Sequence, residues 1–194
     1  MIKGIGFSPT HCELWDCCEH MASHAANATK GAFYFHMSEM LFAYLSYEAY
    51  LNFVGLRIAP EEWSDERNFF ASGSYQGIRG KLKLIEEKLG FRVDRTAHPY
   101  NTVANLEQFR DLISHGKPDN YQVTSAAVKR SPDFPFSGKL NQWVTPQKAA
   151  EAKSSVFELC RIIHEHVKQI NRLKNDRTFG DEPFSAVEQV EWAP

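Results

Sequence analysis

The stretch that decides the fold is "TKGAFYFHMSEMLFAYLSYEAYLNFVGLRIAP", residues 29 to 60. It is long, aromatic and apolar on several faces, which is typical of a helix at the centre of a bundle rather than at its surface. Pro60 cannot easily continue the helix, and Ala59 before it is biased away from helical backbone. The sequence therefore predicts one central helix around which the others pack.

Helical patterns on both sides of this stretch predict an all-α fold, an antiparallel bundle of four to five main helices. The other main helices are predicted over residues 16–28, 81–90 and 102–116, with a last one from Pro146 onward, and residues 60–70 predict a turn or a short helix. In the last helix, apolar residues recur at intervals of three and four, which marks a buried stripe: Val156, Leu159, Cys160, Ile163, Val167 and Ile170.

Glycine and capping residues suggest where these helices begin and end. Gly90 suits a C-terminal cap, and Asn101 or Thr102 can cap the helix that follows. The glycine-rich residues 72–80 predict a loop, although an early helical turn is compatible with them. Gly116 and Pro118 mark the end of the helix over 102–116.

Two segments show no helical period. Residues 121–145 contain two prolines and predict a long irregular insertion before the last helix, or a short hairpin. The acidic tail, 176–194, is expected to be irregular and to pack on the bundle through Phe179, Phe184 and Trp192. We interpret residues 1–194 as a single domain with its core at roughly 16–175.

The composition narrows the classes of partner. Hydrophobic residues make up 43% and charged residues 24% of the 194 residues, a globular balance that excludes wholesale disorder. A net charge of -2 argues against a high-affinity duplex binder, while a local site for a short single strand stays compatible. The four cysteines do not resemble a disulfide framework, which indicates a reducing, cytoplasmic compartment. We expect no signal peptide and no membrane partner.

The stretch "FRDLISHGKP", residues 109 to 118, contains the candidate functional residues. On a helix, Val103, Leu106, Phe109 and Ile113 form an apolar stripe, and Arg110 falls inside that arc. An unpaired guanidinium there is costly, so Arg110 must bind a carboxylate, reach an open cleft or lie at a seam with another chain.

A purely structural interpretation accounts for both charged residues of this helix end. Arg110 can bridge to a glutamate of the central helix, such as Glu48. His115 at a helix C-terminus is favoured by the helix dipole. Asp111, four residues before His115, can contact it along the helix.

The hexapeptide "RDLISH" resembles the R-x4-H motif of the HEPN superfamily, in a similar position near the end of a helix late in a helical bundle. The resemblance covers roughly residues 16–175 and implies a metal-independent endoribonuclease that needs no cofactor. It also implies a homodimer with two motifs lining one cleft, often as a toxin or anti-phage effector with an antitoxin or defence partner, or in RNA processing. Lys117 stands where toxins paired with a nucleotidyltransferase antitoxin have the tyrosine of R-x4-H-x-Y, so the resemblance does not extend to that subgroup.

The residue types suit RNA cleavage by the 2′-hydroxyl of the substrate. His115 is the candidate for proton transfer, because imidazole titrates near neutrality. Arg110 is the candidate phosphate clamp. Asp111 either holds the imidazole in one tautomer or contacts Arg110 of a partner protomer, and Ser114 and Lys117 are candidate RNA-binding residues. A non-catalytic HEPN module that binds RNA or nucleotide is the alternative.

Other clusters of metal-ligand types are weaker candidates. His11, Cys12, Cys17, Cys18, His20 and His24 match no standard zinc finger, although Cys17, His20 and His24 share a helix face. Zinc binding there is a third alternative, and buried free cysteines are the simpler interpretation. His164 and His166 project about 200° apart on a helix and are expected to be exposed or bonded near its end.

Overall fold

The protein is a helical bundle in the computed structural model, which describes residues 4–117, 139–170, 173, 176, 178–185 and 189–192. The elements are, in order, β1 (Gly4–Phe7), α1 (Thr10–Asn27), α2 (Ala32–Ile58), α3 (Pro60–Ser64), α4 (Glu66–Phe69), the 3-10 turn η1 (Gly73–Tyr75), α5 (Gly77–Leu89), α6 (Tyr100–Ser114), α7 (Lys139–Trp143), α8 (Pro146–Lys168) and β2 (Gln189–Trp192). The predicted all-α class is confirmed. Within the described residues, no helix is both long enough and apolar enough to cross a membrane.

Helix α2 is the central helix, as the sequence predicts. It packs against α1, α5, α6 and α8. Its side chains are buried on several sides, and Tyr50, Leu51 and Val54 are fully enclosed although they follow one another within five residues. A helix that is apolar around most of its circumference is stable only when neighbours cover it on those sides.

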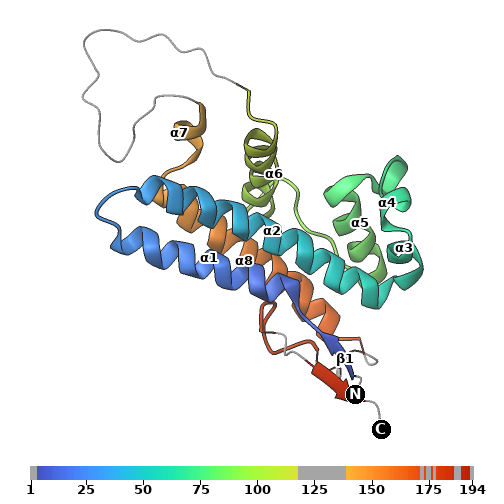
Figure 1. The fold of residues 1–194 in the computed structure, drawn as a ribbon. Coiled ribbons are helices and arrows are strands. Elements are labelled where there is room, and N and C mark those ends of the chain that lie inside the picture. Colours follow the sequence, from blue (N-terminus) through green and yellow to red (C-terminus); the bar gives the residue numbers. More distant parts are fainter. Residues whose placement is uncertain are drawn as a thin grey trace.

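Helices α1, α2 and α8 lie side by side as the long axis of the molecule (Figure 1). Helix α1 runs antiparallel to α8, because Trp15 lies 5.8 Å from Phe157 between ring centroids while Lys153 Nζ, one turn earlier in α8, reaches Glu19 Oε2 at 3.1 Å. Thr145 caps α8 by accepting a hydrogen bond from the backbone N–H of Lys148, and Pro146 occupies its first turn as predicted.

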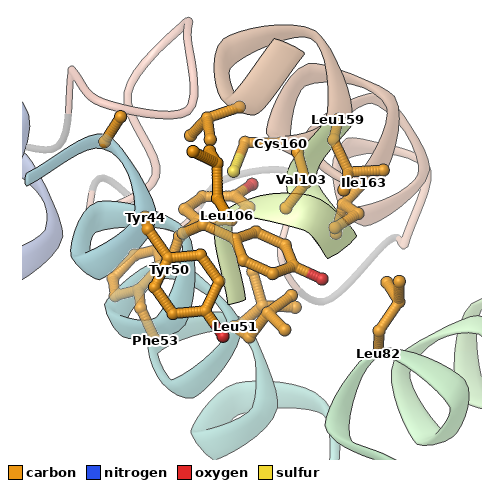
Figure 2. Close-up of a cluster of buried hydrophobic side chains, with 14 of the residues drawn as sticks. Tyr44, Tyr50, Leu51, Phe53, Leu82, Val103, Leu106, Leu159, Cys160 and Ile163 are labelled. Carbon is orange, nitrogen blue, oxygen red and sulfur yellow. The ribbon is translucent and has the colours of Figure 1, made fainter. Parts of the chain in front are cut away.

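The core lies where α2, α5, α6 and α8 meet (Figure 2). The apolar stripe predicted for α8 is confirmed, since Val156, Leu159, Cys160, Ile163 and Val167 are completely buried. These side chains meet the aromatic residues of α2 and the apolar faces of α5 and α6. The labelled members are Tyr44, Tyr50, Leu51, Phe53, Leu82, Val103, Leu106, Leu159, Cys160 and Ile163.

Three helices begin earlier than predicted. Helix α1 starts at Thr10 rather than residue 16, because Cys12, Trp15 and Cys18 recur every three residues on one buried face. Helix α5 starts at Gly77, so part of the segment predicted as a loop is its first turn. Helix α6 starts at Tyr100, which places Asn101 and Thr102 inside the helix rather than at its cap.

The two irregular segments also differ from expectation. Residues 118–138 lie outside the described part of the chain, so the predicted insertion or hairpin is not described there, and residues 139–143 form α7. In the tail, Gln189–Trp192 pairs antiparallel with Gly4–Phe7, so this part of the tail is a strand. Phe179 and Phe184 pack on the core as predicted, while the side chain of Trp192 lies outside the described part.

Candidate functional site

Helix α6 holds the candidate site through its apolar stripe. Val103, Leu106 and Phe109 are buried, and Phe109 is fully enclosed, with its ring centroid 6.2 Å from that of Trp143. This packing fixes the rotation of the helix on α2 and α8. Arg110 therefore projects toward α2, as the helical wheel predicts.

Arg110 is bound by two carboxylates of its own chain. Its Nη2 lies 3.1 Å from Oε1 of Glu48 on α2, and its Nη1 lies 2.9 Å from Oδ1 of Asp111. The side chain remains 30% exposed, so part of the guanidinium still meets solvent. The ion pair with Glu48 is the one predicted by the purely structural interpretation of Arg110. Because Arg110 finds its carboxylates here, its place in the apolar stripe no longer requires a seam with a second chain.

The inner side of the guanidinium lies against Tyr44. The Arg110 Cζ atom is 5.6 Å from the centroid of the Tyr44 ring. Arg110 Nε and Tyr44 Oη are both buried, and within the described residues neither makes a hydrogen bond of good geometry. Burial and the nearby carboxylates of Glu48 and Glu107 raise the pKa of Tyr44. Burial opposes the charge of Arg110, but Glu48, Tyr44 and Asp111 outweigh it and raise the pKa of the guanidinium.

His115 lies at the exposed C-terminal end of α6. Its backbone N–H donates to the carbonyl oxygen of Asp111 at 2.9 Å, which closes the last turn. Its imidazole is exposed, and so are Asp111, Ser114 and Lys117. The Asp111 carboxylate bonds to Arg110, an arrangement that sequence analysis did not include. All five predicted site residues thus lie within the last two turns of α6 and the residues just after it.

A hollow of about 290 Å³ opens beside Arg110, between α2, α4, α5 and α6. Besides Arg110, its walls include Glu48, Glu66, Arg67 and Lys81. The lining is therefore mostly charged, with three cations and two carboxylates, and Lys81 in it is bound to Glu66. A larger hollow of about 450 Å³ lies on another side of α6, next to α7 and α8, but none of the predicted site residues lines it.

The N-terminal cysteines and histidines do not converge. Among the described residues, no group of three metal-ligating side chains surrounds a common point. Cys12 and Cys18 are buried, whereas His20 and His24 are exposed. Burial is the main cause that raises the pKa of the Cys18 thiol to about 12, followed by the nearby Glu39 carboxylate.

Two histidines form a buried polar layer that the sequence did not predict. His164 was expected to be exposed or bonded near the helix end, but it is buried, with Nδ1 3.0 Å from the Tyr50 hydroxyl and Nε2 3.2 Å from the Gly180 carbonyl oxygen. The expectation failed because the tail folds back over this side of α8. His11 lies in the same region, with its ring centroid 4.3 Å from that of Phe53. The one signal for this layer in the sequence is the position of His164 beside the apolar stripe of α8.

Comparisons with known proteins assign no family to the chain. No family model, no curated protein and no solved structure matches it. What the candidate site can do must therefore follow from its own residues.

Proposed function

We propose that the protein is a metal-independent endoribonuclease of the HEPN type, in which Arg110 clamps a phosphate and His115 transfers a proton. The observation that supports this most is the combination at one helix end. A partly exposed guanidinium lines a charged hollow, and an exposed imidazole follows five residues later. Histidine suits the proton transfer and arginine suits the charge stabilisation that phosphodiester cleavage by the substrate's own hydroxyl needs.

In the proposed reaction, a base removes the proton of the ribose 2′-hydroxyl, and the resulting oxygen attacks the adjacent phosphorus. The bond from phosphorus to the 5′-oxygen breaks, and an acid returns a proton to that oxygen. Arg110 stabilises the charge that develops on the phosphoryl oxygens. Within the described residues, the carboxylates beside Arg110 are already paired, since Glu48 and Asp111 bind Arg110 and Glu66 binds Lys81. The proposed reaction therefore uses no pair of catalytic metal ions.

One histidine cannot be base and acid at the same moment, so a homodimer would supply the second imidazole. The exposed end of α6, from Asp111 to Lys117, is the surface where two copies would meet. Ser114 and Lys117 would then flank the RNA. A cytoplasmic toxin, anti-phage or RNA-processing role, with an antitoxin or defence-system partner, belongs to the same proposal.

One observation favours the alternative, a non-catalytic module that binds RNA or nucleotide through the same residues. The Asp111 carboxylate bonds to Arg110, and no other side chain of the described residues orients the His115 imidazole. A catalytic histidine is commonly fixed by such a partner. Measurement of cleavage separates the two functions.

The experiment compares cleavage of a fluorescent single-stranded RNA by wild type, His115→Ala and His20→Ala. His20 is an exposed histidine on α1, so its substitution controls for the loss of an imidazole as such. We expect cleavage by wild type and by His20→Ala in the presence of EDTA, and none by His115→Ala. Binding of the RNA without cleavage by wild type supports the non-catalytic module and contradicts the nuclease.

A further inference from the structure

A groove runs between α5 and α6, which both pack on α2. Three hollows follow one another along it: the Arg110 hollow of about 290 Å³, a narrow neck of about 10 Å³, and a basic hollow of about 440 Å³. Ile78 lines both the Arg110 hollow and the neck, and Arg79 and Tyr100 line both the neck and the basic hollow. We call these three neighbouring hollows together the α5–α6 groove. The basic hollow and the Arg110 hollow lie at its two ends, and the narrow neck shares lining residues with both.

The basic hollow is lined by cations from two consecutive segments, α5 and the connection that follows it. Arg79 and Lys83 come from α5, and Arg92 and Arg95 come from the connection to α6. Glu86 is the one carboxylate among the residues that line it. A concentration of positive charge in a hollow attracts anions from solution more strongly than the same charges spread over a convex surface.

Glu86 is buried beneath this hollow and holds the segment after α5 in place. Its side chain is only 1% exposed, and its carboxylate accepts hydrogen bonds from the backbone N–H of Val93 at 2.7 Å and from Arg95 Nη2 at 2.5 Å. Arg92 makes two longer contacts, with Nη1 3.6 Å from Glu86 and Nη2 3.6 Å from Glu87. The buried carboxylate therefore fixes the connecting segment while Arg92 and Arg95 remain 64% and 37% exposed. Because both side chains remain accessible to solvent, an anionic ligand can compete with these carboxylates for the guanidinium groups.

Lys83 is the least satisfied cation of the hollow. Within the part of the chain that the structure describes, its ammonium group has no carboxylate partner. It donates to the backbone carbonyl of Ser74 at 3.3 Å and lies 4.9 Å from the centroid of the Tyr75 ring. Arg95 likewise lies over an aromatic ring, that of Tyr100, at 4.4 Å. Cations next to aromatic rings are the combination that single-stranded nucleic acids bind.

The neck between the two hollows is bridged by one ion pair. Arg79 Nε lies 2.8 Å from Glu107 Oε2, and the Arg79 side chain is mostly exposed. An exposed pair of this kind contributes little to stability, so a phosphate can compete with Glu107 for the guanidinium.

We propose that the α5–α6 groove binds the phosphate backbone of single-stranded RNA, with the basic hollow holding phosphates on one side of the cleaved bond and Arg110 holding the cleaved one. This inference rests on the proposed function for the identity of the ligand. A net charge of -2 does not favour duplex binding, but a local basic groove suits a short single strand.

The test measures binding separately from cleavage. The probe is a fluorescent 12-nucleotide single-stranded RNA with 2′-O-methyl groups throughout, which the proposed reaction cannot cut. Fluorescence anisotropy gives its dissociation constant at several salt concentrations for wild type, Lys83→Gln and Lys83→Gln/Arg92→Gln. The control is Lys153→Gln/Arg161→Gln, two cations of α8 that lie outside the groove and bind Glu19 and Glu165.

We expect Lys83→Gln/Arg92→Gln to bind roughly five- to twenty-fold more weakly near 0.1 M salt. The slope of the logarithm of the binding constant against the logarithm of the salt concentration should become less steep by about 1.4, which corresponds to two lost phosphate contacts. The control should bind like wild type. Lys83→Gln leaves no carboxylate unpaired, so it should fold normally and show about half of the effect on the slope.

Different outcomes separate this inference from the nuclease. If the groove variants lose binding and no RNA is ever cut, RNA binding by the groove is supported and the proposed nuclease activity is contradicted. If RNA is cut but the groove variants bind like the control, the groove inference is overturned while the nuclease stands. Wild type that does not bind the probe, or binds a duplex of the same sequence as tightly as the single strand, also overturns it.

Discussion

Arg110 and Glu48 join α6 to α2 through an ion pair in which Nη2 lies 3.1 Å from Oε1. Both side chains are more than two-thirds buried, so the pair is screened less than one on the surface. The same guanidinium is the proposed phosphate clamp. Arg110 therefore has a structural role in addition to its proposed functional one.

Arg110→Ala should abolish RNA cleavage, because the proposed phosphate clamp is lost. Because the ion pair is lost as well, the substitution should also lower the free energy of unfolding by about 1 kcal/mol. The reason is that Glu48 loses its counter-charge while solvent reaches it only in part. Urea denaturation of wild type, Arg110→Ala, Glu48→Gln and the double variant gives the coupling between the two side chains. A coupling of about 0.5–1 kcal/mol is expected, and independent effects of the two substitutions would contradict the ion pair.

The buried His11 should make the protein lose stability as the pH falls below neutrality. Its imidazole is 1% exposed. Burial, then the positive charges of Arg57 and His164, lower its pKa from 6.5 to about 4. Between these two values the unfolded chain binds a proton at this position and the folded chain does not. The contribution of His11 to the free energy of unfolding should therefore be most favourable above pH 6.5. It should fall by up to about 1.4 kcal/mol per pH unit as the pH is lowered toward 4.

Urea denaturation of wild type and His11→Gln at pH values from 4 to 7.5 tests this. The free energy of unfolding of the variant should depend less steeply on pH between 4 and 6.5, since one titrating group has been removed. The pKa of His164 is also lowered, mainly by burial, so some dependence should persist in the variant. Identical slopes for the two proteins would show that His11 is not buried in its neutral form.

The long helices could be predicted because their apolar periods are local. Helix α8 shows one unbroken stripe, and α2 is apolar on several faces, so burial follows from each segment by itself. The strand pair could not be predicted in this way. Its register joins Gly4 to Trp192, and no local pattern links residues at opposite ends of the chain.

The candidate site was predictable in part for the same reason. The spacing within α6 places Arg110 inside the buried stripe, and this predicts a carboxylate partner such as Glu48 of the central helix. The α5–α6 groove was not predictable, since Lys83 and Arg92 meet only after the chain turns at Gly90 and Glu86 binds the returning segment. The glycine-rich stretch also concealed the start of α5, because glycine disfavours a helix unless close packing requires it.

Gly80 is such a position, and its substitution by alanine should be strongly destabilising. A Cβ atom at residue 80 would lie 1.8 Å from the carbonyl oxygen of Tyr75, which belongs to the backbone of η1 and cannot rotate away. We expect a loss of about 2 kcal/mol or more, in spite of the better helix propensity of alanine. Thermal denaturation measures it. Gln108→Ala, an exposed position of α6, is the control and should stay within about 0.5 kcal/mol of wild type.

The last prediction concerns the products of cleavage. Imidazole can move a proton and guanidinium can stabilise charge, whereas the nearby carboxylates of Glu48 and Asp111 are bound to Arg110. The attacking oxygen should therefore come from the substrate, and the 2′-hydroxyl lies next to the phosphorus. Cleavage should leave a 2′,3′-cyclic phosphate on one fragment and a 5′-hydroxyl on the other. It should be faster in single strands, where the backbone can reach the in-line geometry that an A-form helix prevents.

Mass spectrometry of the fragments, with and without EDTA, measures these ends directly. A substrate with a single deoxyribose at the cleaved position is the matched control, because it keeps every phosphate that Arg110 and the α5–α6 groove would bind. It should be bound and not cut. Fragments ending in a 3′-hydroxyl, or cleavage only after magnesium is added, would overturn this chemistry even if Arg110 and His115 both proved essential. In that case the two residues would bind the RNA, and the reacting groups would have to lie elsewhere.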